Sequence, residues 1–311
     1  MDYQIEADWH LLNTCNYRCQ YCFFSPEVLG DKLRIFASPQ EWQQAFDSTG
    51  YRWLLHMTGG EPSIYPQFVG LCEALTQRHF ISINSNLSRR SFEMFADRID
   101  PERVSFVNAG FHLEERERHV GSDIFLRHAA LLLESGFRLF VSLVATPDSL
   151  ARFEEAVDLF APLGVVPIPK AIRGLYAGKH YPAAYSAEDK SRFRHFAALA
   201  RHSQMAPQIV PERPTVDILH DDEFLDGMPV FTGQSCEAGR SFVRMDPNGE
   251  AFRCGTSESL GNVRQGTFAR RARPAPCDTN YCPYFCQKYA KKMPPPSQVP
   301  IWRRISNHWR N

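Results

Sequence analysis

Three cysteines near the start of the chain have a spacing that suits an iron–sulfur cluster. They are Cys15, Cys19 and Cys22, in a C-x3-C-x2-C loop just after the first predicted strand. Three neighbouring thiolates can bind three corners of a cubane [4Fe–4S] cluster and leave the fourth iron open to another ligand. A structural zinc site is the alternative, but it needs a fourth protein ligand and is typical of paired C-x2-C units.

A glycine-rich turn follows the second predicted strand, with the sequence Met57-Thr58-Gly59-Gly60-Glu61-Pro62. Glycine has no side chain, so the backbone of such a turn can approach a ligand closely and present its carbonyl and amide groups. A turn of this kind occurs by itself more often as a plain turn than as a functional site. Beside a C-x3-C-x2-C loop, the same turn is a specific signal of a functional site. The two motifs together indicate a cluster with a cosubstrate site beside it.

The elements that must position these motifs alternate between strands and helices. The sequence Ser38-Pro39-Gln40-Glu41 has the pattern of a capping box, Ser122 or Asp123 begins a helix that Gly136 ends, and Ser186 begins another. Apolar runs rich in β-branched and aromatic residues predict strands at 5–12, 53–58, 80–84, 104–111, 139–145 and 165–169. Six such units predict an α/β fold, a partial (β/α)6 barrel with its active site at the C-terminal ends of the parallel strands.

The pattern changes near residue 205, where short strands, turns and clustered cysteines replace the long alternating units. We therefore predict a barrel over residues 1–205, a cysteine-rich region over 206–293 and a basic, proline-rich tail over 294–311. Within the second region, the turn residues 246–249 indicate a hairpin between strands at 242–245 and 250–253.

The loop with Tyr21 before its third cysteine, the GGEP turn and the (β/α)6 pattern resemble the radical S-adenosylmethionine superfamily. The resemblance implies that Cys15, Cys19 and Cys22 ligate the cluster, and that S-adenosylmethionine binds the open iron through its amino and carboxylate groups. Gly59, Gly60 and Glu61 would contact the methionine end. A flavodoxin- or ferredoxin-type reductant would supply the electron that produces a 5′-deoxyadenosyl radical, which abstracts a hydrogen atom from the substrate.

Polar residues near the ends of the later strands are candidates for contacts with the cosubstrate or the substrate. They are Asn84, Asn86, His112, Ser142 and Arg173. Asn and Ser also favour turns and caps, so a structural role is the alternative for these positions.

Five further cysteines follow the barrel, at Cys236, Cys254, Cys277, Cys282 and Cys286. This half resembles the SPASM and twitch extensions of the superfamily, which bind auxiliary iron–sulfur clusters. The five cysteines imply one auxiliary [4Fe–4S] cluster, and so two clusters in all, with a four-thiolate zinc site as the alternative. One cysteine is then left over. Either it belongs to the last three, or it is Cys254, with Cys236, Cys277, Cys282 and Cys286 as the ligands.

The left-over cysteine bears on the reaction. A weak S–H bond makes a thiol a good hydrogen-atom donor, although an inert buried thiol is the commonest fate of an unpaired cysteine. The chain resembles the aminoglycoside-tailoring members, with neomycin C epimerase as the example, and this implies inversion of a sugar carbon with Cys254 as the donor. The alternatives are a dehydrogenase, with the auxiliary cluster as electron acceptor, and a peptide-modifying enzyme. The GGEP turn argues against a simple electron carrier.

Charge is balanced overall, since 35 Lys and Arg match 35 Asp and Glu. It is not evenly distributed along the chain. From Arg264 onward there are ten basic residues and one acidic residue, which leaves a net charge of −9 on the first 263 residues. An acidic body is compatible with a small cationic sugar substrate. The candidate carboxylates are Glu114, Glu115, Asp221, Asp222 and Glu223.

Composition excludes several other classes of protein. The zero net charge argues against nucleic-acid binding, although the basic tail carries Trp302 and Trp309. The sequence has neither an apolar run of about eighteen residues nor a signal-peptide pattern at its N-terminus. We therefore expect a cytoplasmic protein whose cysteines are reduced thiols, with no membrane as partner.

Overall fold

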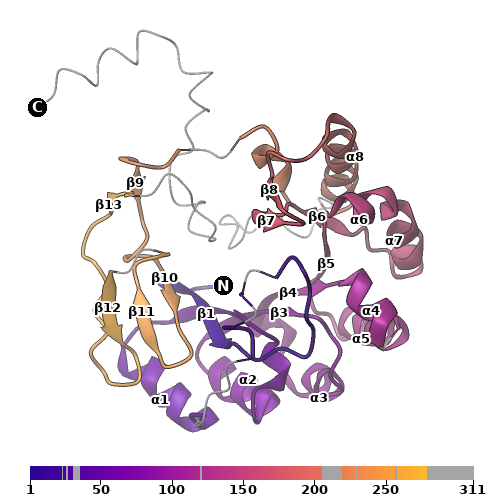
Figure 1. The fold of residues 1–311 in the computed structure, drawn as a ribbon. Helices are drawn as coiled ribbons and strands as arrows, with labels where there is room; N and C mark the ends of the chain where they lie inside the picture. The colour runs from indigo at the N-terminus through magenta and orange to yellow at the C-terminus, as the bar shows by residue number, and fades with distance from the viewer. Residues whose placement is uncertain are drawn as a thin grey trace, which may run out of the picture.

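The computed structural model describes residues 1–22, 24–25, 27–30, 36–119, 121–204, 219–227, 230–255 and 258–278. These residues form an α/β structure around one curved sheet (Figure 1). The strand order in that sheet is β12-β11-β10-β1-β2-β3-β4-β5-β6. The predicted α/β class and parallel partial barrel are confirmed, because each neighbouring pair from β1 to β6 is parallel.

The parallel strands lie close to the predicted positions. They are β1 (Ile5–Leu12), β2 (Trp53–Gly59), β3 (Phe80–Ser85), β4 (Val104–Gly110), β5 (Leu139–Val144) and β6 (Ile168–Lys170). The largest difference is at β6, which begins at Ile168 instead of residue 165. β6 pairs with β5 only over Ile168–Lys170.

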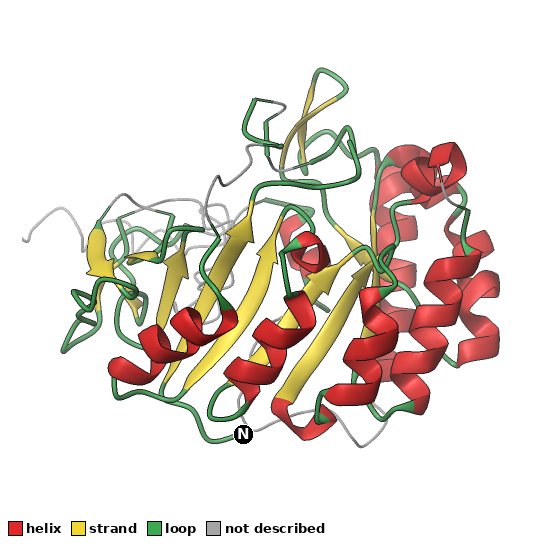
Figure 2. Ribbon diagram, turned by 90° about the horizontal axis from the view of Figure 1, so that it is seen from below, coloured by secondary structure: helices red, strands yellow, loops and turns green. Residues whose placement is uncertain are grey.

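The helices cover the outer side of the curved sheet (Figures 1 and 2). They are α1 (Pro39–Ser48), α2 (Phe68–Thr76), α3 (Ser91–Arg98), α4 (Leu113–His119), α5 (Asp123–Glu134), α6 (Pro147–Ala151), α7 (Phe153–Phe160) and α8 (Ala187–Gln204). The predicted capping box is present at α1, where Glu41 N–H donates to Ser38 Oγ and Ser38 N–H donates to Glu41 Oε2. Ser122 precedes α5 but makes no side-chain cap bond.

Alternation along β1 separates the apolar core from a polar interior. Ile5, Ala7 and Trp9 belong to the buried hydrophobic cluster that also contains residues of the helices. The indole of Trp9 packs edge-on against Trp42 of α1, with 4.6 Å between ring centroids. The intervening side chains are polar and point to the inner face of the sheet, because successive strand residues face opposite sides.

A buried hydrogen-bonded chain fills part of that interior. His56 Nδ1 lies 2.6 Å from Ser82 Oγ, and His56 Nε2 lies 3.1 Å from Glu6 Oε2. Tyr3 Oη donates to the other oxygen of Glu6 at 2.8 Å. The polar groups of Glu6, His56 and Ser82 in this chain therefore have partners, as buried polar groups require.

The C-terminal strands extend the barrel sheet at the β1 edge. β10 (Phe242–Met245) is parallel to β1, whereas β11 (Glu250–Phe252) and β12 (Ser259–Asn262) continue antiparallel. The predicted hairpin is thus confirmed, and the sheet contains strands from both sides of residue 205. Two smaller ladders join β7 (Gly174–Tyr176) to β8 (Lys179–Tyr181) and β9 (Ser235–Cys236) to β13 (Ala275–Pro276).

Candidate functional site

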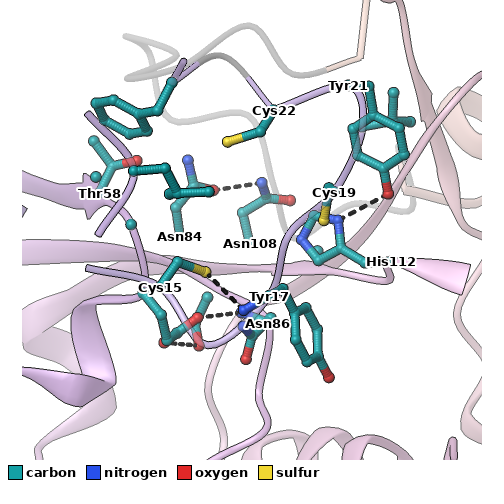
Figure 3. Close-up of a pocket in the computed structure, with 18 of the residues that line it drawn as sticks. Cys15, Tyr17, Cys19, Tyr21, Cys22, Thr58, Asn84, Asn86, Asn108 and His112 are labelled. Carbon is teal, nitrogen blue, oxygen red and sulfur yellow. Dashed lines mark hydrogen bonds between the residues drawn. The ribbon is translucent and has the colours of Figure 1, made fainter. Parts of the chain in front are cut away.

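A cavity of about 400 Å³ lies at the C-terminal ends of the parallel strands (Figure 3). Loops that are far apart in the sequence contribute to its wall. The predicted residues that line it are Cys15, Cys19, Cys22, Gly59, Gly60, Glu61, Asn84, Asn86, His112 and Ser142. The sequence therefore identified side chains that the fold brings to a single cavity.

Each thiol of the cysteine loop is half-buried and has a hydrogen-bond donor close by. Burial raises the pKa of the three thiols, to about 11 at Cys15 and about 12 at Cys19. Hydrogen bonds act in the opposite direction, from Tyr17 N–H to Cys15 (3.4 Å), from Tyr21 to Cys19 and from Phe24 N–H to Cys22. Such donors stabilise thiolates that ligate a metal centre.

The loop itself is held by charged side chains. Arg18 Nη1 donates to the carbonyl oxygens of Cys15 (2.6 Å) and Tyr17 (2.8 Å). The backbone N–H of Arg18 donates to Glu115 Oε2 at 3.0 Å, and Arg118 approaches the other oxygen of Glu115. Glu115 was a candidate for binding a cationic substrate, but its carboxylate instead anchors the cysteine loop.

The two glycines of the GGEP turn allow two chain segments to pack closely. A Cβ at Gly59 would overlap Leu12 O, and a Cβ at Gly60 would overlap Thr14 O. Gly60 N–H donates to Leu12 O at 2.7 Å, and Glu61 N–H donates to Thr14 O at 2.9 Å. The glycines therefore place the turn after β2 directly against the residues that lead into the cysteine loop.

Glu61 is buried with both carboxylate oxygens occupied. Its Oε1 accepts from Ser63 N–H (3.1 Å), Ser63 Oγ (2.5 Å) and Ser85 Oγ (2.7 Å), and its Oε2 accepts from Asn86 N–H (2.7 Å). Burial raises the pKa of Glu61, while these donors act to lower it. The resemblance implies that Glu61 contacts the methionine end of S-adenosylmethionine. In the structure, its carboxylate ties the GGEP turn to the end of β3.

His112 and Tyr21 form a pair on the cavity wall (Figure 3). Tyr21 Oη lies 3.0 Å from His112 Nδ1. Burial, with Arg116 nearby, lowers the pKa of His112 to about 4, so the imidazole is neutral near pH 7. A neutral imidazole has one N–H donor, so the Tyr21 hydroxyl can accept from His112 Nδ1–H while it donates to the Cys19 thiol.

Four polar lining residues were missed from the sequence, namely Asp8, His10, Ser85 and Asn108. Asn108 Nδ2 donates to Asn84 Oδ1 at 2.5 Å, which joins β4 to β3 on the inner face. The available signal was polar residues alternating with apolar ones inside predicted strands. Within an otherwise apolar strand, such positions identify the side that faces the barrel interior.

Arg173 does not line the cavity. Its guanidinium instead forms an ion pair with Asp221. Asp221 Oδ1 accepts from Arg173 Nη2 (2.8 Å) and Lys170 Nζ (2.9 Å), and Oδ2 accepts from Ala171 N–H (3.0 Å). Burial acts to raise the pKa of Asp221, but the two cations outweigh it and hold that pKa below its usual value. Asp221 therefore neutralises two cations after β6 and has no oxygen left for a cationic substrate.

Three of the C-terminal cysteines lie together, in a second part of the structure. Cys236, Cys254 and Cys277 are buried in a small cluster with Phe231, Ala238 and Phe242. The Cys236 strand β9 pairs with β13, which immediately precedes Cys277. Cys254 is not among the residues that line the cavity. Cys282, Cys286 and the predicted tail over 294–311 lie outside the described residues.

Comparison with known proteins agrees with the geometry of the cavity. Residues 9–160 match the Radical SAM superfamily, a range that includes the cysteine loop and the GGEP turn. This range of the chain is thus similar to a Radical SAM superfamily domain. No curated protein matches the sequence.

Solved structures share the fold at low sequence identity. Streptococcus suis SuiB bound to S-adenosylmethionine is 16% identical with a TM-score of 0.56, over 85% of this chain and 64% of SuiB. SuiB bound to its precursor peptide SuiA is 15% identical with the same TM-score, over 85% of this chain and 63% of that chain. The anSMEcpe structure with bound AdoMet is 14% identical with a TM-score of 0.56, over 86% of this chain and 81% of that chain. The chain thus spans less than two thirds of SuiB. None of the helices that the structure describes is long and apolar enough to cross a membrane.

Proposed function

We propose that this protein is a radical S-adenosylmethionine enzyme whose Cys15, Cys19 and Cys22 ligate a [4Fe–4S] cluster at the cavity. The observation that carries the proposal is that all three thiols of one short loop line the same cavity, at the C-terminal ends of parallel strands. The Radical SAM match over residues 9–160 supports the same assignment.

The residues present suit such a cluster better than a single metal ion. Among the described residues, no three His, Cys, Asp or Glu side chains lie close enough to hold one ion. A cubane distributes its irons over separate corners, so its thiolates lie further apart than thiolates that share one ion. The donors directed at Cys15, Cys19 and Cys22 also favour the thiolate form, which is the form that binds iron.

When bound, the cluster and S-adenosylmethionine supply a 5′-deoxyadenosyl radical that takes a hydrogen atom from a substrate carbon. The chain contributes binding, orientation and exclusion of water. The buried Tyr17 and the aromatic rings of Tyr21 and Phe24 form apolar parts of the wall. Asn84, His112 and Ser142 present polar atoms from three different strand ends, as orientation of a small molecule requires.

Two outcomes of that hydrogen abstraction are proposed, and they differ in the role of Cys254. In the first outcome the enzyme is an epimerase of a cationic sugar, with Cys254 returning a hydrogen atom to the opposite face. The second is a dehydrogenase in which Cys254 is a ligand of an auxiliary cluster. The burial of Cys254 beside Cys236 and Cys277, away from the cavity wall, favours the second outcome. SuiB and anSMEcpe have been solved with bound peptides, so a peptide substrate is a further class to test.

Iron and acid-labile sulfide content, measured anaerobically, tests both clusters at once. We expect about eight irons per chain in the wild type and about four in the Cys15/Cys19/Cys22→Ala triple variant, because each cubane holds four. Zinc in place of iron in the triple variant would exclude the auxiliary cluster. Equal iron content in the two proteins would exclude the assignment of the N-terminal loop.

A further inference from the structure

Asp8 is a buried carboxylate on the cavity wall with one oxygen that has no hydrogen-bond partner. It lies in the middle of β1 and is 4% exposed. Its Oδ1 makes no hydrogen bond to any described residue, and its Oδ2 lies 3.7 Å from His10 Nε2. A buried carboxylate oxygen without a donor is costly, so this position requires an explanation.

The contrast with Glu61 shows that the cavity does not leave carboxylates unpaired in general. Glu61 is the other carboxylate of the lining, and both of its oxygens accept hydrogen bonds from the protein. Glu115 and Asp221, two further buried acids, are likewise occupied by backbone N–H groups and basic side chains. Asp8 therefore differs from the buried acids around the site.

No Lys or Arg side chain of the described residues forms an ion pair with Asp8, and among their basic side chains only that of His10 lies within 4 Å of its carboxylate. The nearest candidate by register is Arg244, which is paired with Asp8 between β1 and β10. The Arg244 guanidinium instead lies over the ring of Phe252, 4.4 Å from its centroid, and forms no ion pair with Asp8 among the described contacts. The charge of Asp8 is thus available to a cation that enters the cavity.

A second acceptor belongs to the same wall. Asn108 Oδ1 is buried and has no hydrogen-bond partner among the described residues. The amide nitrogen of the same side chain donates to Asn84. A carboxylate oxygen and an amide oxygen, both without donors, suit a ligand that carries several hydrogens and a positive charge. A primary ammonium has three N–H donors and no acceptor.

We propose that Asp8 binds an ammonium group of the substrate, with Asn108 as a second acceptor for the same molecule elsewhere on the cavity wall, and that the two residues so select amines for the reaction. This inference rests on the proposed function, because it assigns the substrate class of the same cavity. The ammonium could belong to an amino sugar or to a lysine side chain of a peptide. A neutral sugar would leave Asp8 buried without a counter-charge and is disfavoured for that reason.

The test is binding to the cluster-loaded protein, measured by ligand-observed NMR under anaerobic conditions. The probes are glucosamine, glucose and Nα-acetyl-lysine amide, of which the first two differ in one ammonium group. The variants are Asp8→Asn, Asn108→Ala and Asp158→Asn. Asp158 is an exposed residue of α7, so its variant changes the net charge by the same amount at a distance from the cavity.

We expect the wild type and Asp158→Asn to bind glucosamine or the lysine derivative in preference to glucose. Asp8→Asn should weaken that binding at least tenfold, which corresponds to about 1.4 kcal/mol, and Asn108→Ala should weaken it less. Binding of the lysine derivative alone would identify a peptide as the source of the ammonium. Unchanged amine affinity in both Asp8→Asn and Asn108→Ala, or a preference for glucose, would overturn the proposal.

S-adenosylmethionine carries an ammonium of its own, so its affinity is measured for the same variants. A tenfold weaker affinity for S-adenosylmethionine in Asp8→Asn, with amine binding unchanged, would assign Asp8 to the cosubstrate and also overturn the proposal. Failure of the proposed function has a different signature. In that case the wild type would contain no [4Fe–4S] cluster and release no 5′-deoxyadenosine, whatever the amine measurements show.

Discussion

The Asn86 backbone N–H donates to Glu61 Oε2 at 2.7 Å and so ties the turn after β2 to the loop after β3. The contact joins two motifs that the sequence presents separately. It fixes the turn that packs against the entry to the cysteine loop. The position of the cysteine loop therefore depends on a carboxylate that has no oxygen left for a ligand.

Glu61→Gln should destabilise the protein. The amide nitrogen of glutamine would face one of the donors that now contact the carboxylate, and a buried donor would lose its acceptor. The cost of an unsatisfied buried group is about 1–3 kcal/mol. Urea unfolding followed by circular dichroism measures it, with Glu188→Gln on the exposed start of α8 as the control. Equal stability of the two variants would show that Glu61 is not an anchor.

Gly60→Ala should lose iron from the N-terminal cluster. A Cβ at Gly60 would overlap the Thr14 carbonyl, so the turn and the cysteine loop must separate. Gly70→Ala is the matched control, because its Cβ would make only ordinary contacts, with Pro39 Cγ at 3.7 Å and Gln67 Cβ at 3.9 Å, and alanine favours a helix interior. We expect about four fewer irons in Gly60→Ala and full iron content in Gly70→Ala. Full loading of both variants would contradict the packing argument.

Acid should destabilise the fold through His79. Trp53 N–H donates to His79 Nδ1, and His79 Nε2 lies 3.3 Å from Asp47 Oδ1. Burial lowers the pKa of His79 to about 4, although Asp47 acts to raise it. The unfolded value is about 6.5, so between these values the unfolded chain binds a proton that the folded chain does not. The free energy of unfolding should therefore fall by roughly 1 kcal/mol between about pH 7.5 and pH 5.5 through this residue.

The measurement is urea unfolding of the wild type and His79→Gln at both pH values. The variant has no imidazole at this position, so it should lose less stability on acidification than the wild type does. Identical losses in the two proteins would show that His79 is not the group that titrates.

Cys254→Ala distinguishes the two proposed outcomes. If Cys254 is a ligand, the variant should lose about four irons, as its burial beside Cys236 and Cys277 suggests. If it is the hydrogen donor, the variant keeps both clusters, and turnover of the wild type in D2O places one deuterium at the inverted carbon. Cys72→Ala is the control, since Cys72 is buried among the hydrophobic residues of α2. A product two mass units lighter than the substrate, with no deuterium, would exclude epimerisation.

Much of the fold follows from local sequence patterns. The apolar runs of β1 to β5 and the capping box at Ser38 depend on neighbouring residues, so their positions could be predicted closely. The pairing of β10 with β1 depends on residues more than two hundred positions apart, and no local pattern specifies it.

Site residues that belong to a sequence motif could be predicted. Site residues that are identified only by their position in a strand of the folded sheet could not. The cysteines and the GGEP turn have a recognisable spacing, whereas Asp8 and Asn108 are polar strand residues that belong to no motif. Which carboxylate keeps an unpaired oxygen depends on all of its neighbours. Glu61, Glu115 and Asp221 are satisfied by partners that only the folded chain brings close.

The central claim is that the Cys15–Cys19–Cys22 loop ligates the cluster that cleaves S-adenosylmethionine. The most direct measurement is the release of 5′-deoxyadenosine from S-adenosylmethionine by the reconstituted, dithionite-reduced Cys19→Ala variant. We predict that release falls to the background of protein-free samples, while Cys72→Ala retains the wild-type rate and Cys19→Ala retains its auxiliary cluster. Release of 5′-deoxyadenosine by Cys19→Ala at a rate comparable to that of the wild type would contradict the account.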